Sequence, residues 1–274
     1  MIICLYALAI AISSWATGQQ GDVIFIDGEK WTLLGEPIQA DSALAHRLLE
    51  ILPKDRELCS SNWKGYTAYW SIKDECLYLD SILVSTGTRV LCLSDSDMHK
   101  VFHDYYCKTS GEGYNDEGII ARWLTCNIRA GKGRKIYYEH AGYLRDLEYE
   151  QIITINEGRV MGKKAYHNCV AIEGFSFNQF HKNEEFKEKI DFPFEDYPEL
   201  AGKKVMFYVT KIQIDTLGNL IDCYVSTDGK DEVLNKRLVQ DMKTALMNIR
   251  PWKVLFIREE YLPDVKNRRF TLPF

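Results

Sequence analysis

Two histidines and a cysteine recur at every fourth position along one segment of the chain. His99, His103 and Cys107 stand at i, i+4 and i+8, so all three side chains would project from one face of a helix. Imidazole nitrogen and thiolate sulfur are ligands that zinc, copper and nickel accept. These residues, with Asp95 or Asp104 nearby, are candidate metal ligands. The alternative, which we prefer, is that they border an apolar helix face and that the protein holds no metal.

Aromatic residues are concentrated between positions 63 and 78. Flat rings offer a large contact area to a sugar or a peptide at a small entropic cost. In a β-hairpin, however, aromatic residues at alternate positions mostly fill a core or pair across strands. We therefore expect core packing rather than a ligand platform from Trp63, Tyr66, Tyr69, Trp70 and Tyr78.

The sequence offers no motif that assigns a reaction. We find no GxSxG, HExxH, P-loop or GxGxxG pattern at a strand-to-helix turn. Glu139 and His140 are neighbours, but successive residues of a strand point to opposite faces and cannot easily cooperate. The sequence GKGRK at residues 131–135 is interpreted as a basic turn. We assign no catalytic residue, no cofactor-binding residue and no cofactor, and we favour a binding role over an enzymatic one.

Composition and charge narrow the class of protein. With 274 residues, of which 46% are hydrophobic and 27% charged, the chain can build two domains with cores of their own. The net charge is −5 and no run of basic residues exceeds two, which argues against a nucleic-acid partner. Seven cysteines follow residue 18, an odd number without a CxxC pair, so we assign no disulfide.

The first residues predict export. An apolar run from Ile2 to about Ala11 is followed by small residues, with Ala16 and Gly18 at the −3 and −1 positions of a cleavage site. The run is shorter than the roughly 20 residues that span a bilayer. We expect residues 1–18 to be a signal peptide and the mature protein to be periplasmic or otherwise in the cell envelope. Neither an integral membrane span nor a lipid anchor is expected; the oligomeric state stays open.

Periodicity predicts an antiparallel-sheet-rich α+β domain over residues 22–180. Hairpins are expected at residues 23–33, where Asp27-Gly28 suits a type I′ turn, and at residues 66–84 around Lys73-Asp74-Glu75. Helices are expected at residues 41–52 and 94–107 from their capping residues and apolar spacing. Four further strands are expected at residues 119–128, 135–143, 150–156 and 159–166.

A change of composition separates this domain from the rest of the chain. Residues 181–196 are charged and show little alternation, so they are the expected linker. After it, two strands flank the turn formed by residues 215–219, and Asp231 caps an amphipathic helix that ends at Arg250-Pro251. A short last strand is expected at residues 268–274. The predicted order is ββαβ.

Several motifs in this last region resemble the TonB carboxyl-terminal domain. They follow one another in the order found in that family, and they cover less than a third of the chain. The residues that carry the resemblance are Tyr197-Pro198-Glu199-Leu200, Asp215 and Gly218 in the hairpin turn, Leu234-Asn235 where the family usually has Leu-Asp on the helix, Trp252 after it, and Leu272-Pro273-Phe274 in the last strand.

The resemblance implies a small sheet packed on a helix, with an exposed edge that accepts an extended peptide. Energy-transducing members bind segments of outer-membrane receptors in this way, by strand addition. They also carry a membrane helix and a long proline-rich spacer, so we do not expect this chain to transduce energy. The predicted function is docking of an envelope protein or peptide by residues 197–274. The alternatives are an envelope enzyme or a glycan-binding protein with its site in the first domain.

Overall fold

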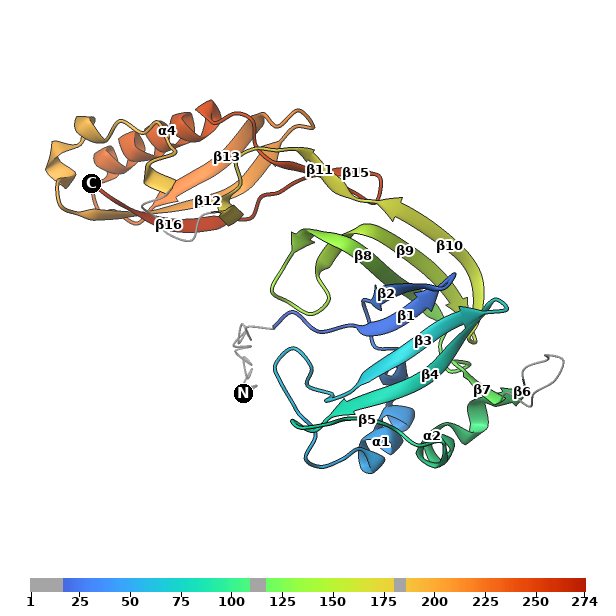
Figure 1. Ribbon diagram of the computed structural model, residues 1–274. Coiled ribbons are helices and arrows are strands. Elements are labelled where there is room, and N and C mark those ends of the chain that lie inside the picture. Colours follow the sequence, from blue (N-terminus) through green and yellow to red (C-terminus); the bar gives the residue numbers. More distant parts are fainter. Residues whose placement is uncertain (1–16, 109–116, 180–185) are drawn as a thin grey trace, which may run out of the picture. The chain divides into compact units, whose positions relative to one another are not determined.

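The computed structural model describes residues 17–108, 117–179 and 186–274, and the chain divides into two units, Met1–Ala165 and Tyr166–Phe274 (Figure 1). The predicted signal peptide lies almost wholly outside the described residues. Both units combine helices with mostly antiparallel sheet, which confirms the α+β class.

The first unit is built on a ten-stranded sheet in the order β10-β9-β8-β2-β1-β3-β4-β7-β6, with β5 paired to β4. All described pairings within it are antiparallel except that between β1 and β3. Its strands are β1 (Asp22–Ile26), β2 (Glu29–Leu33), β3 (Thr67–Lys73), β4 (Cys76–Ser85), β5 (Val90–Cys92), β6 (Tyr106–Lys108), β7 (Glu117–Ile120), β8 (Cys126–Tyr138), β9 (Arg145–Asn156) and β10 (Arg159–His167).

This sheet joins back on itself. Besides its place beside β9, β10 pairs with β4 at Arg159 and Cys76. The amide of Leu77 donates to the carbonyl of Gly158 at 2.8 Å, and the amide of Val160 donates to the carbonyl of Glu75 at 2.8 Å. A closed array has fewer open edges than a flat one. The pairing of β10 with β4 therefore closes the sheet around the core of the first unit.

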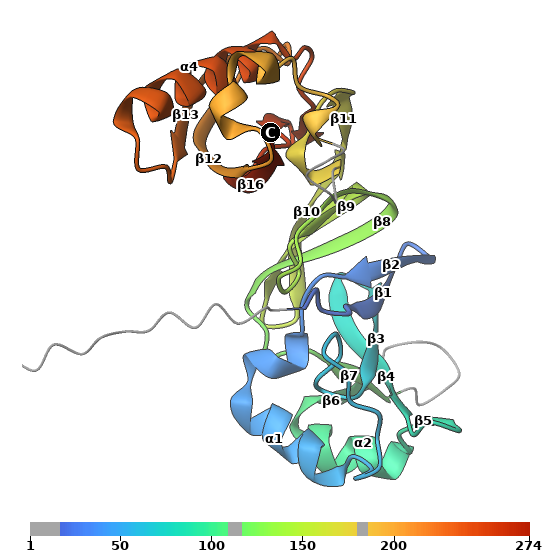
Figure 2. The ribbon, with the colours of Figure 1, turned by 90° about the vertical axis from the view of Figure 1, so that its left-hand side faces the viewer.

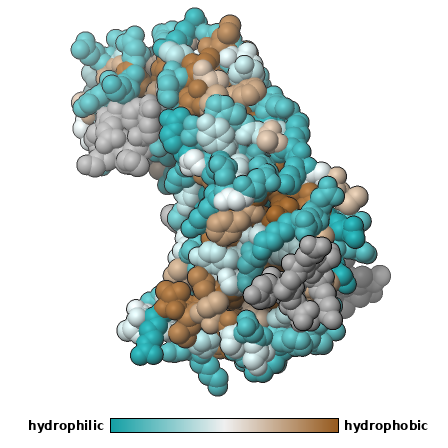
Figure 3. Space-filling model, turned by 45° about the vertical axis from the view of Figure 1, so that its right-hand side comes forward, coloured by the Kyte–Doolittle hydropathy of each residue, from teal (hydrophilic) through white to brown (hydrophobic). Residues whose placement is uncertain are grey.

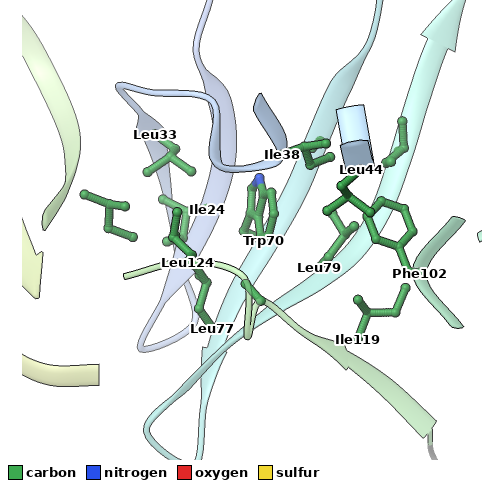
Figure 4. Packing of buried hydrophobic residues seen from close by; sticks show 14 of the residues in the cluster. Ile24, Leu33, Ile38, Leu44, Trp70, Leu77, Leu79, Phe102, Ile119 and Leu124 are labelled. Atoms are coloured by element: carbon green, nitrogen blue, oxygen red, sulfur yellow. The ribbon is translucent and has the colours of Figure 1, made fainter. Parts of the chain in front are cut away.

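Apolar side chains fill the inside of the sheet, and two helices cover one end of it. The helices α1 (Ser42–Ile51) and α2 (Asp95–Phe102) lie together there (Figure 2). Asp41 caps α1, its carboxylate accepting from the amides of Ala43 and Leu44. Figure 4 shows the packing around the fully buried Trp70; the neighbours labelled there are Ile24, Leu33, Ile38, Leu44, Leu77, Leu79, Phe102, Ile119 and Leu124.

Two members of the aromatic segment, Tyr66 and Trp70, belong to this core. Tyr66, Trp70 and Tyr78 are buried and Tyr69 is partly buried. Trp63 differs, with 52% of its surface exposed. It precedes β3, so the alternation of that strand does not direct it inward. The expected core packing is therefore found at Tyr66 and Trp70, whereas Tyr69 lies on the outer face of β3 and lines a surface depression.

A buried ion pair sits at the start of β1. The carboxylate of Asp22 accepts from the ammonium group of Lys64, from the amide of Ala68 at 3.1 Å and from the indole nitrogen of Trp70 at 3.1 Å. Asp22 and Lys64 are 1% and 2% exposed. The Lys64 ammonium also lies 4.7 Å from the centre of the Tyr66 ring. The pair joins the segment before β3 to β1 and is well supplied with partners.

Two-residue turns connect four of the hairpins in the chain. In each, both central residues have positive φ, as a type I′ turn requires. The expected turn at Asp27-Gly28 is present, as is the break after Lys73. The turns are Asp27-Gly28, Asp74-Glu75, Glu157-Gly158 and Arg258-Glu259.

Four expected elements of the first unit differ in the structure. The strand expected at residues 135–143 is not a separate strand, because residues 135–138 are the end of β8 and residues 139–144 connect it to β9. The strand expected at residues 119–128 is interrupted at residues 121–125, where the amide of Leu124 bonds to the carbonyl of Ala121. The basic turn expected at residues 131–135 is instead an irregularity inside the long strand β8, with Gly133 at φ +84°. The helix expected to reach residue 107 ends at Phe102.

The second unit contains two three-stranded sheets, ordered β11-β14-β15 and β13-β12-β16. The helix α4 packs on the buried face of the second sheet (Figures 1 and 2). Asp231 caps this helix as expected. The elements are β11 (Cys169–Ile172), β12 (Lys204–Ile214), β13 (Leu220–Thr227), α4 (Glu232–Asn248), β14 (Val254–Ile257), β15 (Glu260–Pro263) and β16 (Arg268–Pro273).

The segment expected to be a linker packs into this second unit. Residues 181–185 lie outside the described residues, but Phe186, Ile190 and Phe192 are buried in the core around Trp252 and Phe270. The division of the chain falls at residue 165 rather than near 180. The linker prediction relied on the many charged residues of this segment, and it missed the apolar side chains between them that are buried.

Tyr197 ties the beginning of the expected docking region to α4. Its hydroxyl donates to Asp241 Oδ2 at 2.6 Å, and the Arg237 guanidinium lies 4.9 Å from the ring centre. Burial and the hydrogen bond to Asp241 both raise the pKa of Tyr197. The phenol therefore stays a neutral donor.

Replacing Tyr197 with phenylalanine should remove this bond and little else. A hydrogen bond to a charged group contributes about 1.5–3 kcal/mol, and we expect a loss of unfolding free energy at the low end because Asp241 is only partly buried. Urea unfolding measures it. Tyr208→Phe is the control, since the Met206 sulfur is the only hydrogen-bond partner of the Tyr208 hydroxyl among the described residues. Equal losses in both variants would contradict this role.

Candidate functional site

The structure does not assemble the candidate metal ligands. His99 belongs to α2, His103 follows its last residue, and Cys107 lies on β6. The change from helix to strand removes the shared face that the i, i+4, i+8 spacing would give. Within the described ranges, no group of three His, Cys, Asp or Glu side chains is placed to hold a metal ion.

Each candidate instead has a local partner. The His99 ring stacks on Tyr106 with 4.8 Å between ring centres. His103 Nε2 lies 3.2 Å from a carboxylate oxygen of the adjacent Asp104. Arg122 Nη2 donates to the Cys107 sulfur at 2.7 Å. All three contacts are local and lie close to the surface around β6.

Glu139 and His140, which we expected not to cooperate, have different partners. Glu139 accepts from the Tyr137 hydroxyl at 3.2 Å. His140 Nδ1 lies 2.9 Å from the Tyr138 hydroxyl.

The seven cysteines from Cys59 to Cys223 are all free thiols.

The outer edge of β13 is an open backbone edge of the second unit. β13 pairs with β12 on one side, and none of the described strands pairs with its other side. An unpaired edge offers a row of amides and carbonyls to another extended chain. Sequence reasoning predicted an edge of this kind without identifying the strand.

The alternation of backbone hydrogen bonds along β12 shows which backbone amides and carbonyls of β13 point away from the sheet. The Phe274 amide donates to the Lys203 carbonyl at 3.0 Å, so β12 alternates with its odd residues bonded towards β16 and its even residues towards β13. Tyr208 and Thr210 stand opposite Ser226 and Tyr224. The backbone of Val225, between the last two, therefore points away from β12. Cys223 and Thr227 share that direction.

The side chains of β13 provide contacts along the same edge. Val225 is buried against the core, whereas Ile221 and Tyr224 are 58% and 57% exposed. Figure 3 shows one face of the molecule, on which hydrophobic atoms form separate patches in a mostly hydrophilic surface. Exposed apolar side chains beside an open edge suit a partner that binds as a strand.

No protein-family model, curated protein or solved structure matches this chain. The function is therefore inferred from the geometry of the chain itself. Among the described residues, no helix combines the length and the apolar character that crossing a bilayer demands.

Proposed function

We propose that this protein is an exported docking protein of the cell envelope that holds an extended segment of a protein or peptide partner against β13. The observation that carries the proposal is the unpaired edge at Val225. The resemblance of residues 197–274 to TonB carboxyl-terminal domains supports the same mode of binding. The partner binds non-covalently and no reaction is involved.

Within the sheet β13-β12-β16, the composition of the two edge strands favours β13 over β16. Edges that must not bind other strands usually carry proline or charged side chains. β16 has the sequence RRFTLP, with two arginines and a proline, and the carbonyl of Pro273 accepts from Lys187. β13 has the sequence LIDCYVST, without lysine, arginine or proline. Its one charged residue, Asp222, is paired with Lys243, so β13 carries less of this protection than β16.

The expected affinity comes from two sources. Each net backbone hydrogen bond contributes about 0.5–1.5 kcal/mol, and the outward groups of Cys223, Val225 and Thr227 define the register. Ile221 and Tyr224 add apolar area, at about 25 cal/mol per Å² removed from water. The backbone supplies affinity, and these two side chains supply selectivity among partners.

Site-specific photocrosslinking tests the edge in cells. Benzoylphenylalanine placed at position 224 of the full chain is expected to give a discrete crosslinked partner. The same group at position 233 is the control, because Val233 is 73% exposed but lies on α4. Products common to both positions, or none at position 224, would argue against docking at β13.

A second measurement distinguishes strand addition from contact by side chains alone. Binding of the crosslinked partner should slow hydrogen exchange at the amides of Val225 and Thr227, which point outward. The amides of Tyr224 and Ser226 are already paired with β12 and should change less. In addition, Tyr224→Lys should reduce capture, whereas Val233→Lys should not. Uniform protection along β13 would contradict the proposed geometry.

A further inference from the structure

A broad depression lies on the first unit, outside the core. It has a volume of about 820 Å³, a size that suits a small-molecule ligand. Its floor includes Val23, Thr32 and Tyr69, which alternate with the core residues Ile24 and Leu33 and with Trp70. The floor is therefore the outer face of β2, β1 and β3.

The charges around this depression are almost all positive. Lys30, Lys132, Lys135 and Arg145 line it, and the only acidic lining residue is Asp22. The Asp22 carboxylate is turned into the core and is neutralised by Lys64.

One of the four cations is neutralised as well. The Lys132 ammonium pairs with the Glu29 carboxylate and lies over the Trp31 ring. Lys30, Lys135 and Arg145 have no carboxylate partner among the residues that the structure describes. Three uncompensated cations from three strands thus surround one depression, although the whole chain has a net charge of −5.

Of the three cations, Arg145 gives the strongest indication that the depression binds an anion. Its side chain is partly buried, and desolvation by burial lowers the pKa of its guanidinium. An arginine nevertheless keeps its charge at neutral pH. A partly desolvated cation without a counter-ion is costly, and a bound anion would offset that cost. The Lys135 ammonium lies 4.5 Å from the ring centre of Tyr138, and Tyr138 is the residue that stands opposite Arg145 in the β8–β9 pairing.

Neutral polar groups complete the lining. Hydroxyl side chains come from Thr32, Ser61, Thr67 and Tyr69, and Gln20 adds an amide. Hydroxyl and amide groups suit the hydroxyls of a carbohydrate, whereas the guanidinium fork matches phosphate oxygens in bidentate geometry. Both kinds of group occur together in one depression.

We propose that this depression binds a phosphorylated carbohydrate, with Arg145, Lys30 and Lys135 holding the phosphate. The ligand is either a free sugar phosphate or the headgroup of a phosphorylated glycolipid. This site lies in the first unit and is independent of docking at β13.

Calorimetric titration of the full chain with fructose bisphosphate tests the proposal. We expect binding that is at least about tenfold tighter than binding of fructose, because charge-assisted hydrogen bonds are the strong ones. Arg145→Gln should weaken binding about tenfold or more, and Lys30→Gln and Lys135→Gln severalfold. Arg134→Gln is the matched control: Arg134 lies on the same strand as Lys135, pairs with Glu148 and does not line the depression.

Three outcomes separate the possibilities. Equal binding of fructose and its bisphosphate, or equal losses in Arg134→Gln and Arg145→Gln, would overturn the proposal. Because Lys30 is exposed, Lys30→Gln keeps the test valid if Arg145→Gln does not fold. Vesicles of phosphatidylcholine with and without phosphatidylinositol phosphate distinguish the sources: binding to the phosphorylated vesicles, lost in Lys30→Gln, identifies a headgroup.

Discussion

Replacing Lys64 with methionine is expected to lower the free energy of unfolding of the first unit by about 3–5 kcal/mol. This is the usual cost of removing one partner of a buried ion pair, because the remaining charge stays in a medium that solvates it poorly. The Asp22 carboxylate would keep its bonds from the Ala68 amide and the Trp70 indole but would lose its counter-ion. Denaturant unfolding followed by the fluorescence of the buried tryptophans measures the loss.

Lys73→Met provides the matched control for this variant. Lys73 pairs with Asp80 at 3.1 Å, but its side chain is 62% exposed, and an exposed pair contributes about 0–1 kcal/mol. The double variant Asp22→Asn with Lys64→Met should lose less unfolding free energy than the sum of the losses in the two single variants. Each single variant leaves one buried charge without its partner, whereas the double variant leaves none. Strict additivity, or equal losses in Lys64→Met and Lys73→Met, would show that the pair is not coupled.

Trp252→Ala is expected to destabilise the second unit by a similar amount, about 3–5 kcal/mol. Trp252 is 0% exposed and lies at the centre of an aromatic cluster, with ring centres 4.6 Å from Phe175 and 5.5 Å from Phe177. Truncation would leave a cavity among side chains from distant parts of the chain. Hydrogen exchange at the amides of β12 localises the loss to this unit.

Trp252→Phe separates packing from hydrogen bonding. The indole nitrogen of Trp252 has no hydrogen-bond partner among the described residues, so phenylalanine removes volume without breaking a bond. We expect a loss well below that of Trp252→Ala. Trp63→Ala, at an exposed tryptophan of the first unit, should leave β12 unchanged. Losses of the same size in the phenylalanine and alanine variants would mean that the cluster tolerates no change of shape.

The sequence predicted elements whose signals are local. Asp27-Gly28 favours a type I′ turn by itself, and Asp41 and Asp231 cap the helices that follow them. The hairpin of β14 and β15 was missed because its turn is Arg258-Glu259, which lacks the glycine or asparagine that usually indicates positive φ. The linker was predicted wrongly for a different reason. Its charged residues are evident in the sequence, but the burial of Phe186 depends on partners far along the chain, which the sequence does not reveal.

The sites depend still more on tertiary structure. The metal interpretation assumed that one helix carries His99, His103 and Cys107, and that helix ends before the cysteine. The cations Lys30, Lys135 and Arg145 belong to three different strands, so no spacing in the sequence relates them. The β13 edge could be expected from the resemblance, but its orientation at Val225 requires the register of β12.

The seam between β4 and β10 bears on how the first unit folds. Most of its other pairings are hairpins or lie close in sequence, and such local contacts form readily. Cys76 and Arg159 meet only after about 80 intervening residues have been ordered, and closing a loop of that length carries an entropic cost that no local turn offsets. The pairing of β2 with β8 joins residues still farther apart, such as Thr32 and Gly131, so closure of the sheet depends on two long-range pairings and is expected late in folding.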